Sequence, residues 1–156
     1  MALQLDQAPA AATGMLIRSP VADVFAAFVD PGVTTMFWFT KSSGRLEPGA
    51  RVVWEWEMYG VSAPLIVKAL EPDARIVIEW TEDGTTTEWT FTPHGRDRTF
   101  VAITHRGFTG DGDAVVKKAL DSVGGFSLVL AGLKALLEHG IRLNLVGDRF
   151  PAPVET

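Results

Sequence analysis

The chain has 156 residues, a length that suits one domain with a sizeable buried core. Its net charge of -5 and the lack of a Lys/Arg-rich run disfavour a nucleic-acid-binding surface, which needs clustered cations. It contains no cysteine, which excludes disulfides, thiolate catalysis and cysteine-bound zinc or iron–sulfur clusters.

The first forty residues predict one strand and two short helices. Residues 1–11 are rich in Ala, Gln and Pro and are expected to be a flexible N-terminal segment, and residues 13–18 form a short apolar strand. Ser19-Pro20 and Asp30-Pro31 each read as an N-cap followed by proline at the first helical position. The second of these helices leads toward Met36-Phe37-Trp38-Phe39.

Five extended runs follow the turn at Pro48-Gly49. They are rich in β-branched and aromatic residues, which favour strands. The gaps between them are short and turn-like, as in antiparallel hairpins. The predicted strands are Arg51–Met58, Val61–Leu70, Arg75–Trp80, Thr85–Phe91 and Thr99–His105.

Aromatic residues in these strands share one side of the predicted sheet. Because side chains alternate along a strand, Trp54, Trp56 and Met58 lie on one face, and Glu55 and Glu57 on the other. The same parity groups Trp80 with two isoleucines, Trp89 with Phe91, and Ile103 with His105. The sequence therefore predicts an aromatic inner face.

From Ala114 to His139 the apolar spacing is helical, and Phe126 and Leu130 fall in the centre of the apolar arc. Gly140 is a suitable stop for this helix. Residues 141–156 form a C-terminal extension with alternating apolar residues, which adds an edge strand, covers a cavity mouth or reaches a partner subunit. A monomer or a homodimer is expected.

The predicted order is β-α-α-β-β-β-β-β-α, which gives one α+β domain over residues 12–140. Several short motifs occur in this order: Ser19-Pro20-x-x-x-Val24-Phe25, Phe37-Trp38-Phe39, Glu47-Pro48-Gly49, Glu71-Pro72-x-x-Arg75-Ile76-x-x-x-Trp80, His105-x-Gly107-Phe108 and Gly125-Phe126. Together they resemble motifs of the SRPBCC (START/Bet v-like) superfamily, in the branch related to the C-terminal domain of the heat-shock protein 90 ATPase activator.

The resemblance implies a helix-grip fold, in which a curved antiparallel sheet, here of six strands, wraps around the long C-terminal helix. It also implies a hydrophobic cavity between the sheet and that helix, with a small apolar molecule as the expected ligand. The residues expected at this ligand site are Trp54, Trp56, Met58, Trp80, Trp89, Phe91, Ile103, His105, Phe126 and Leu130.

Other functions remain open at this stage. Two interpretations of His105 stay open. It is either hydrogen-bonded to a backbone group at the sheet rim or, with an acidic partner, the base of a cyclase- or hydrolase-like enzyme. An exposed patch at residues 36–39 would instead favour a co-chaperone-like interaction module. Aromatic side chains also fill ordinary cores, so the tryptophans alone do not decide between these functions.

The remaining predictions are absences. The three histidines have no metal-ligand spacing, and no nucleophile, phosphate-loop or dinucleotide motif is present, so no catalytic residue, metal or cofactor is predicted. The N-terminus lacks the features of a signal peptide. No stretch reaches the roughly 18 apolar residues that a membrane span needs. A cytoplasmic location is the resulting expectation.

Overall fold

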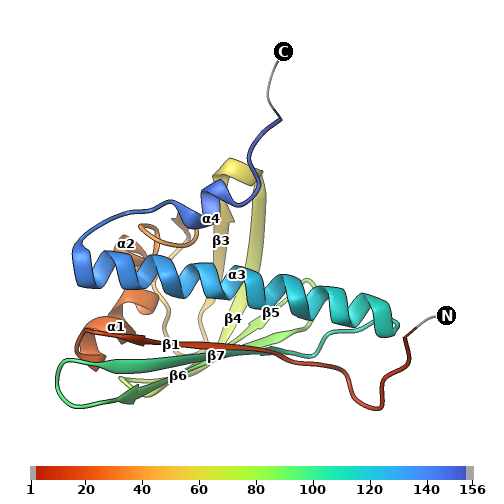
Figure 1. The fold of residues 1–156 in the computed structure, drawn as a ribbon, viewed down its shortest axis with the longest axis horizontal. Coiled ribbons are helices and arrows are strands. Elements are labelled where there is room, and N and C mark those ends of the chain that lie inside the picture. Colours follow the sequence, from red (N-terminus) through yellow and green to blue (C-terminus); the bar gives the residue numbers. More distant parts are fainter. Residues whose placement is uncertain (1–2, 154–156) are drawn as a thin grey trace.

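The computed structural model describes residues 3–153. One open antiparallel sheet curves around the long helix α3 (Gly112–His139), as Figure 1 shows. Two short helices, α1 (Val21–Val29) and α2 (Pro31–Thr34), lie near the C-terminal end of α3. The predicted α+β class and helix-grip arrangement are confirmed. The ends of the predicted terminal segments, residues 1–2 and 154–156, lie outside the described residues.

The sheet has seven strands in the described part of the chain, one more than predicted. Its spatial order is β1-β7-β6-β5-β4-β3-β2, and every neighbouring pair is antiparallel. The additional strand β2 has only two residues, too few for a hydrophobic period. The strands are β1 (Ala11–Ile17), β2 (Lys41–Ser42), β3 (Arg51–Trp56), β4 (Val61–Glu71), β5 (Arg75–Trp80), β6 (Thr86–Pro93) and β7 (Thr99–Arg106).

Local hydrogen bonds set the helix ends. The Asp30 side chain accepts a hydrogen bond from the Gly32 backbone N–H at 2.9 Å, and Asp111 accepts one from Ala114 at 2.8 Å, so each caps a helix. Gly140 ends α3 in the left-handed conformation, with φ of 66°. The predicted cap at Ser19 is wrong, because α1 begins one residue later and its N-cap is Pro20.

The core lies between the inner face of the sheet and α3. Trp54 and Trp89 are its largest fully buried side chains, each only 1% exposed. Phe39 stacks on Trp54 with ring centroids 4.4 Å apart, and Trp38 meets Trp54 edge-on at 4.8 Å. Aromatic contacts at these separations add to the free energy gained from burial alone.

Polar contacts tie the C-terminal half of α3 to the edge strand β1. Lys134 Nζ donates to the Leu16 backbone oxygen at 2.9 Å, and the Glu138 carboxylate accepts from the Arg18 backbone N–H at 2.9 Å. By length and composition α3 could cross a membrane, but seven of its residues are buried in the protein. It is therefore the core helix of the domain, and no membrane span is shown.

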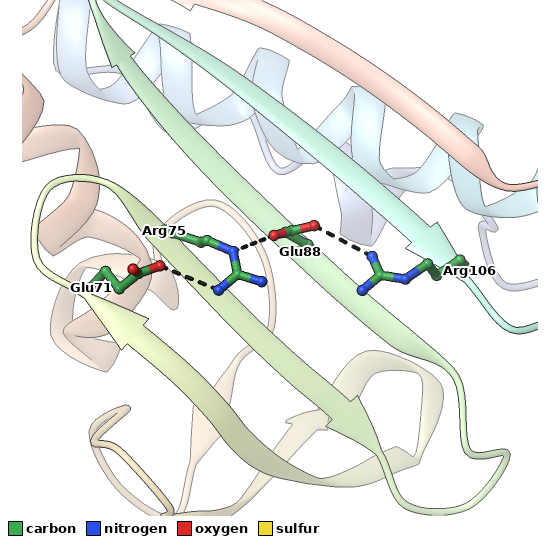
Figure 2. A network of polar contacts seen from close by, with 4 residues as sticks. All are labelled: Glu71, Arg75, Glu88 and Arg106. Atoms are coloured by element: carbon green, nitrogen blue, oxygen red, sulfur yellow. Dashed lines mark hydrogen bonds and ion pairs between the residues drawn. The ribbon is translucent and has the colours of Figure 1, made fainter.

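Charged residues cross the outer face of the sheet, away from α3. Figure 2 shows Glu71, Arg75, Glu88 and Arg106, which come from four neighbouring strands and form a chain of ion pairs. Arg75 pairs with both glutamates, and Arg106 pairs with Glu88 at 3.4 Å. Because these side chains are partly or mostly exposed, each pair contributes only about 0–1 kcal/mol. The core, and not this network, holds the sheet together.

Two leucines of α3 provide a matched test of this packing. Leu133 is fully buried, whereas Leu120 is 67% exposed. We expect Leu133→Ala to lower the free energy of unfolding by about 2–5 kcal/mol through lost burial and a new void. Leu120→Ala should stay within about 0.5 kcal/mol of the wild type. Urea unfolding followed by tryptophan fluorescence measures both; equal losses would contradict this account of the core.

Candidate functional site

A cavity of about 700 Å³ lies between α3, the ends of the four strands β3, β4, β5 and β7, and the C-terminal segment. Its walls are mainly aromatic and aliphatic, and its polar groups are few. Four predicted site residues, Trp56, Trp80, His105 and Phe126, line it. The rest of the lining consists of Trp38, Tyr59, Val61, Lys117, Asp121, Ser122, Gly125, Leu128, Val129, Val146, Arg149 and Phe150.

Five other predicted site residues lie in the packed core, outside the cavity lining. They are Trp54, Trp89, Phe91, Ile103 and Leu130, none more than 5% exposed. The physical reason is the Trp38 side chain, which packs against Trp54 and against Trp89, 4.8 Å and 6.0 Å away between ring centroids. Trp38 thus lies against Trp54 and Trp89, whereas Phe25 and Phe28 of α1 pack against Phe91 at 5.3 Å and 6.0 Å between ring centroids.

Met58 is placed differently from the prediction. The strand that carries Trp54 and Trp56 ends at Trp56, and residues Glu57–Tyr59 form a 3₁₀ turn, labelled η1. Met58 therefore leaves the inner face, is 41% exposed, and lines a smaller cavity of about 270 Å³. Trp38 and Val146 border both cavities.

His105 is the polar centre of the larger cavity. Its Nδ1 lies 2.7 Å from Ser122 Oγ on α3, and its Nε2 lies 2.8 Å from Thr85 Oγ1. Thr85 Oγ1 in turn donates to Asp83 Oδ1 at 2.7 Å. Burial lowers the pKa of His105, and the negative charge of Asp83 acts in the opposite direction. The partners are hydroxyl groups, and not the backbone groups that a rim histidine would use.

Sequence reasoning missed these partners of His105. Asp83 and Thr85 lie in and just after the turn between β5 and β6, far from His105 in sequence. Ser122 precedes Phe126 by four residues, so both lie on one face of α3. That spacing is the signal that could have placed Ser122 beside a predicted cavity wall.

The C-terminal segment closes one side of the cavity. Residues Leu145–Asp148 form a short helix, α4, instead of an added edge strand. The Tyr59 hydroxyl donates to the Val146 backbone oxygen and accepts from the Phe150 N–H at 3.3 Å. Figure 1 shows α4 lying beside α3 near the hairpin of β3 and β4. Three arrangements were expected for this segment: an edge strand, a cover for the cavity mouth, or a contact with a partner subunit. Its described part lies at the cavity mouth.

Two adjacent glycines of α3 face this region. The Arg149 guanidinium occupies the place where a Gly124 side chain would begin, with an Arg149 nitrogen 2.9 Å from an ideal Cβ. A Cβ at Gly125 would meet no atom within 4 Å, and Gly125 lines the cavity. α3 continues without a break through both. The pair therefore makes room beside the helix and does not split it.

The apolar patch expected at residues 36–39 is largely absent. Phe37, Trp38 and Phe39 are buried, at 7%, 8% and 1% exposure, and only Met36 is substantially exposed. These aromatic side chains pack into the core, which removes the feature that favoured a co-chaperone-like module. Within residues 3–153 no group of three or more His, Asp or Glu side chains could hold a metal ion.

The sequence matches a known protein family, and the fold matches those of solved structures. The family model described as "Activator of Hsp90 ATPase homolog 1-like protein" matches residues 18–138. A crystal structure of a Staphylococcus saprophyticus protein is similar at 29% identity and a TM-score of 0.76, over 86% of this chain and 96% of that one. No curated protein matches the sequence.

Two further solved structures share the fold alone, because their identities are low. The Aha1 dimer from Colwellia psychrerythraea is 18% identical with a TM-score of 0.73, over 85% of this chain and 98% of that chain. The di-domain ARO/CYC BexL from the BE-7585A biosynthetic pathway is 17% identical with a TM-score of 0.68, over 83% of this chain and 46% of that one.

The partly buried His105 predicts a pH dependence of stability. Its pKa is lower in the folded protein than the ordinary value of about 6.5. The unfolded chain therefore takes up a proton first as the pH falls, so stability is full above pH 6.5 and decreases below it. We expect His105→Gln to reduce the slope of unfolding free energy against pH between pH 7.5 and 5.5, measured by urea unfolding.

The same substitution at His94 is the control. His94 lies in an exposed turn, outside the Asp83–Thr85–His105–Ser122 chain. His94→Gln should leave the slope unchanged. A wild-type slope that persists in His105→Gln would show that burial of His105 does not cause it.

Proposed function

The chain belongs to the family of activator of Hsp90 ATPase homolog 1-like proteins, and on this basis we propose that it binds a small apolar molecule in the cavity between the sheet and α3. The observation that carries this proposal is the aromatic wall. Trp56, Trp80 and Phe126 face one space of about 700 Å³, a size within the range of about 300–1,000 Å³ typical of ligand pockets.

The composition of the lining supports an apolar ligand. Burial of apolar surface drives binding, and flat aromatic walls add specific contacts to flat ligands. Three residues of the lining are charged. Lys117 and Asp121 are 79% and 65% exposed and pair with each other at 3.2 Å, and Arg149 lies in the exposed part of the C-terminal segment. They belong to the solvent side of the cavity, so the interior offers mainly carbon atoms to a ligand.

Gly125 gives independent support. Glycine in a helix interior costs roughly 1 kcal/mol relative to alanine, and a core helix normally avoids it. Here the missing side chain borders the cavity with no atom within 4 Å of an ideal Cβ. The unfilled space adds to the cavity volume, which fits a residue retained for ligand access and not for packing.

A second candidate function is catalysis at His105. It is favoured by one observation: Ser122, Thr85 and the Asp83 carboxylate form a hydrogen-bonded chain through His105 at the cavity wall. A histidine held in this way can transfer protons to a bound molecule. One structural neighbour is described as ARO/CYC. In this alternative the cavity converts its ligand instead of only holding it.

Mass spectrometry separates the two functions. Wild-type protein is incubated with small-molecule extract of its host, and the bound and free molecules are identified. Simple binding predicts that a molecule is retained with its mass unchanged, by both the wild type and His105→Ala. Catalysis predicts that an extract component is consumed by the wild type and spared by His105→Ala.

Two substitutions at Gly125 test the binding proposal. Gly125→Phe, whose Cβ meets no atom within 4 Å, should place a ring in the cavity and abolish saturable binding of N-phenyl-1-naphthylamine, an uncharged fluorescent probe. Gly125→Ala should keep binding and raise the free energy of unfolding by up to about 1 kcal/mol through helix propensity. Probe fluorescence and urea unfolding measure the two effects. Equal probe binding by Gly125→Phe and wild type would count against this cavity as the site.

A further inference from the structure

We infer that Ser122 makes the cavity selective for ligands that carry a hydroxyl group on an aromatic body. The inference rests on the proposed function and names its ligand class. It follows from the directions of the hydrogen bonds around His105, which the donor and acceptor capacities of the side chains determine.

The chain of hydrogen bonds begins at Asp83. An ionised carboxylate only accepts hydrogen bonds. Asp83 Oδ1 accepts two from Thr85, from its backbone N–H at 2.9 Å and its hydroxyl at 2.7 Å. The single hydroxyl proton of Thr85 is thereby used. Thr85 Oγ1 can only accept at its other contact, so the His105 Nε2–H donates to it at 2.8 Å.

This assignment determines the other side of the imidazole. A neutral histidine carries one N–H and one lone pair, so a protonated Nε2 leaves Nδ1 as the acceptor. Ser122 Oγ lies 2.7 Å from Nδ1 and must donate its proton to it. Burial lowers the pKa of His105, which keeps the ring neutral at neutral pH.

Ser122 Oγ is left with lone pairs and no proton, at the wall of the cavity. The neighbouring donor is also used, because Trp80 Nε1–H donates to Thr87 Oγ1 at 2.8 Å. Likewise, the Tyr59 hydroxyl proton is given to the Val146 backbone oxygen. Ser122 Oγ is therefore an acceptor beside two donors that are already paired, while the N–H groups of Trp38, Trp56 and Arg149 lie elsewhere in the lining. A ligand with a proton to donate, such as a phenol, satisfies the Ser122 oxygen.

The matched probes are 2-naphthol and 2-methoxynaphthalene, which differ by replacement of the hydroxyl proton with a methyl group. Burial of the extra methyl alone would favour the ether. A hydrogen bond to Ser122 reverses that order, and we expect the wild type to bind 2-naphthol about fivefold to tenfold more tightly at pH 7.5. Isothermal titration calorimetry measures both affinities.

Two variants of the same shape isolate the oxygen. Ser122→Thr keeps the hydroxyl and should keep the preference for 2-naphthol. Ser122→Val puts a methyl group in its place and should bind the ether at least as tightly as the phenol. A preference for 2-naphthol that persists in Ser122→Val, or a wild type that prefers the ether, would overturn the inference. If the wild type binds neither probe, the binding proposal itself fails; if it binds both without preference, only this inference fails.

A measurement on the wild type alone gives a second test. Protonated His105 donates from both nitrogens, so Ser122 accepts from Nδ1 and turns its own proton toward the cavity. The charged groups around the ring are Asp83, reached through Thr85, and Lys117, Asp121 and Arg149 of the cavity lining. The preference for 2-naphthol should decrease in step with protonation of the His105 ring, followed by NMR. A constant preference while the ring titrates would overturn the inference.

Discussion

The packing of Trp38 divides the inner face of the sheet into core and cavity. Its ring lies 4.8 Å from Trp54, 6.0 Å from Trp89 and 5.6 Å from Phe126, measured between centroids. On the core side, Trp89 Nε1 is buried and has no hydrogen-bond partner among the described residues. An unpaired buried donor costs about 1–3 kcal/mol. The aromatic contacts outweigh that cost, and they leave the opposite side of Trp38 free to border open space.

At the cavity wall, the hydrogen-bonded chain from Asp83 to Ser122 pairs the polar groups with one another. A cavity wall that contained an unpaired imidazole would lose free energy whenever water left the cavity. Here each proton donor of His105, Thr85 and Ser122 already has a protein acceptor. An apolar ligand beside His105 therefore leaves none of these three donors unsatisfied.

The sequence predicted the fold better than the site, for a physical reason. Strand parity and helix period depend on neighbours along the chain, so the inner face, the cap at Asp30 and the stop at Gly140 were all recognisable. Cavity walls depend on which inner-face residues another segment covers. Trp38 comes from a separate helix end, and its position in front of Trp54 and Trp89 has no periodic signal. Even the resemblance to a family could suggest a cavity but not where core ends and cavity begins.

The C-terminal segment forms one side of the cavity mouth. Its residues Val146, Arg149 and Phe150 complete the lining, and Tyr59 holds the segment through two backbone hydrogen bonds. The segment buries little apolar surface of its own, since Phe150 is 64% exposed. A segment held by a few hydrogen bonds and little buried apolar surface opens at lower free energy than the packed core. The side of the cavity formed by this segment is therefore less firmly held than α3 and the aromatic wall.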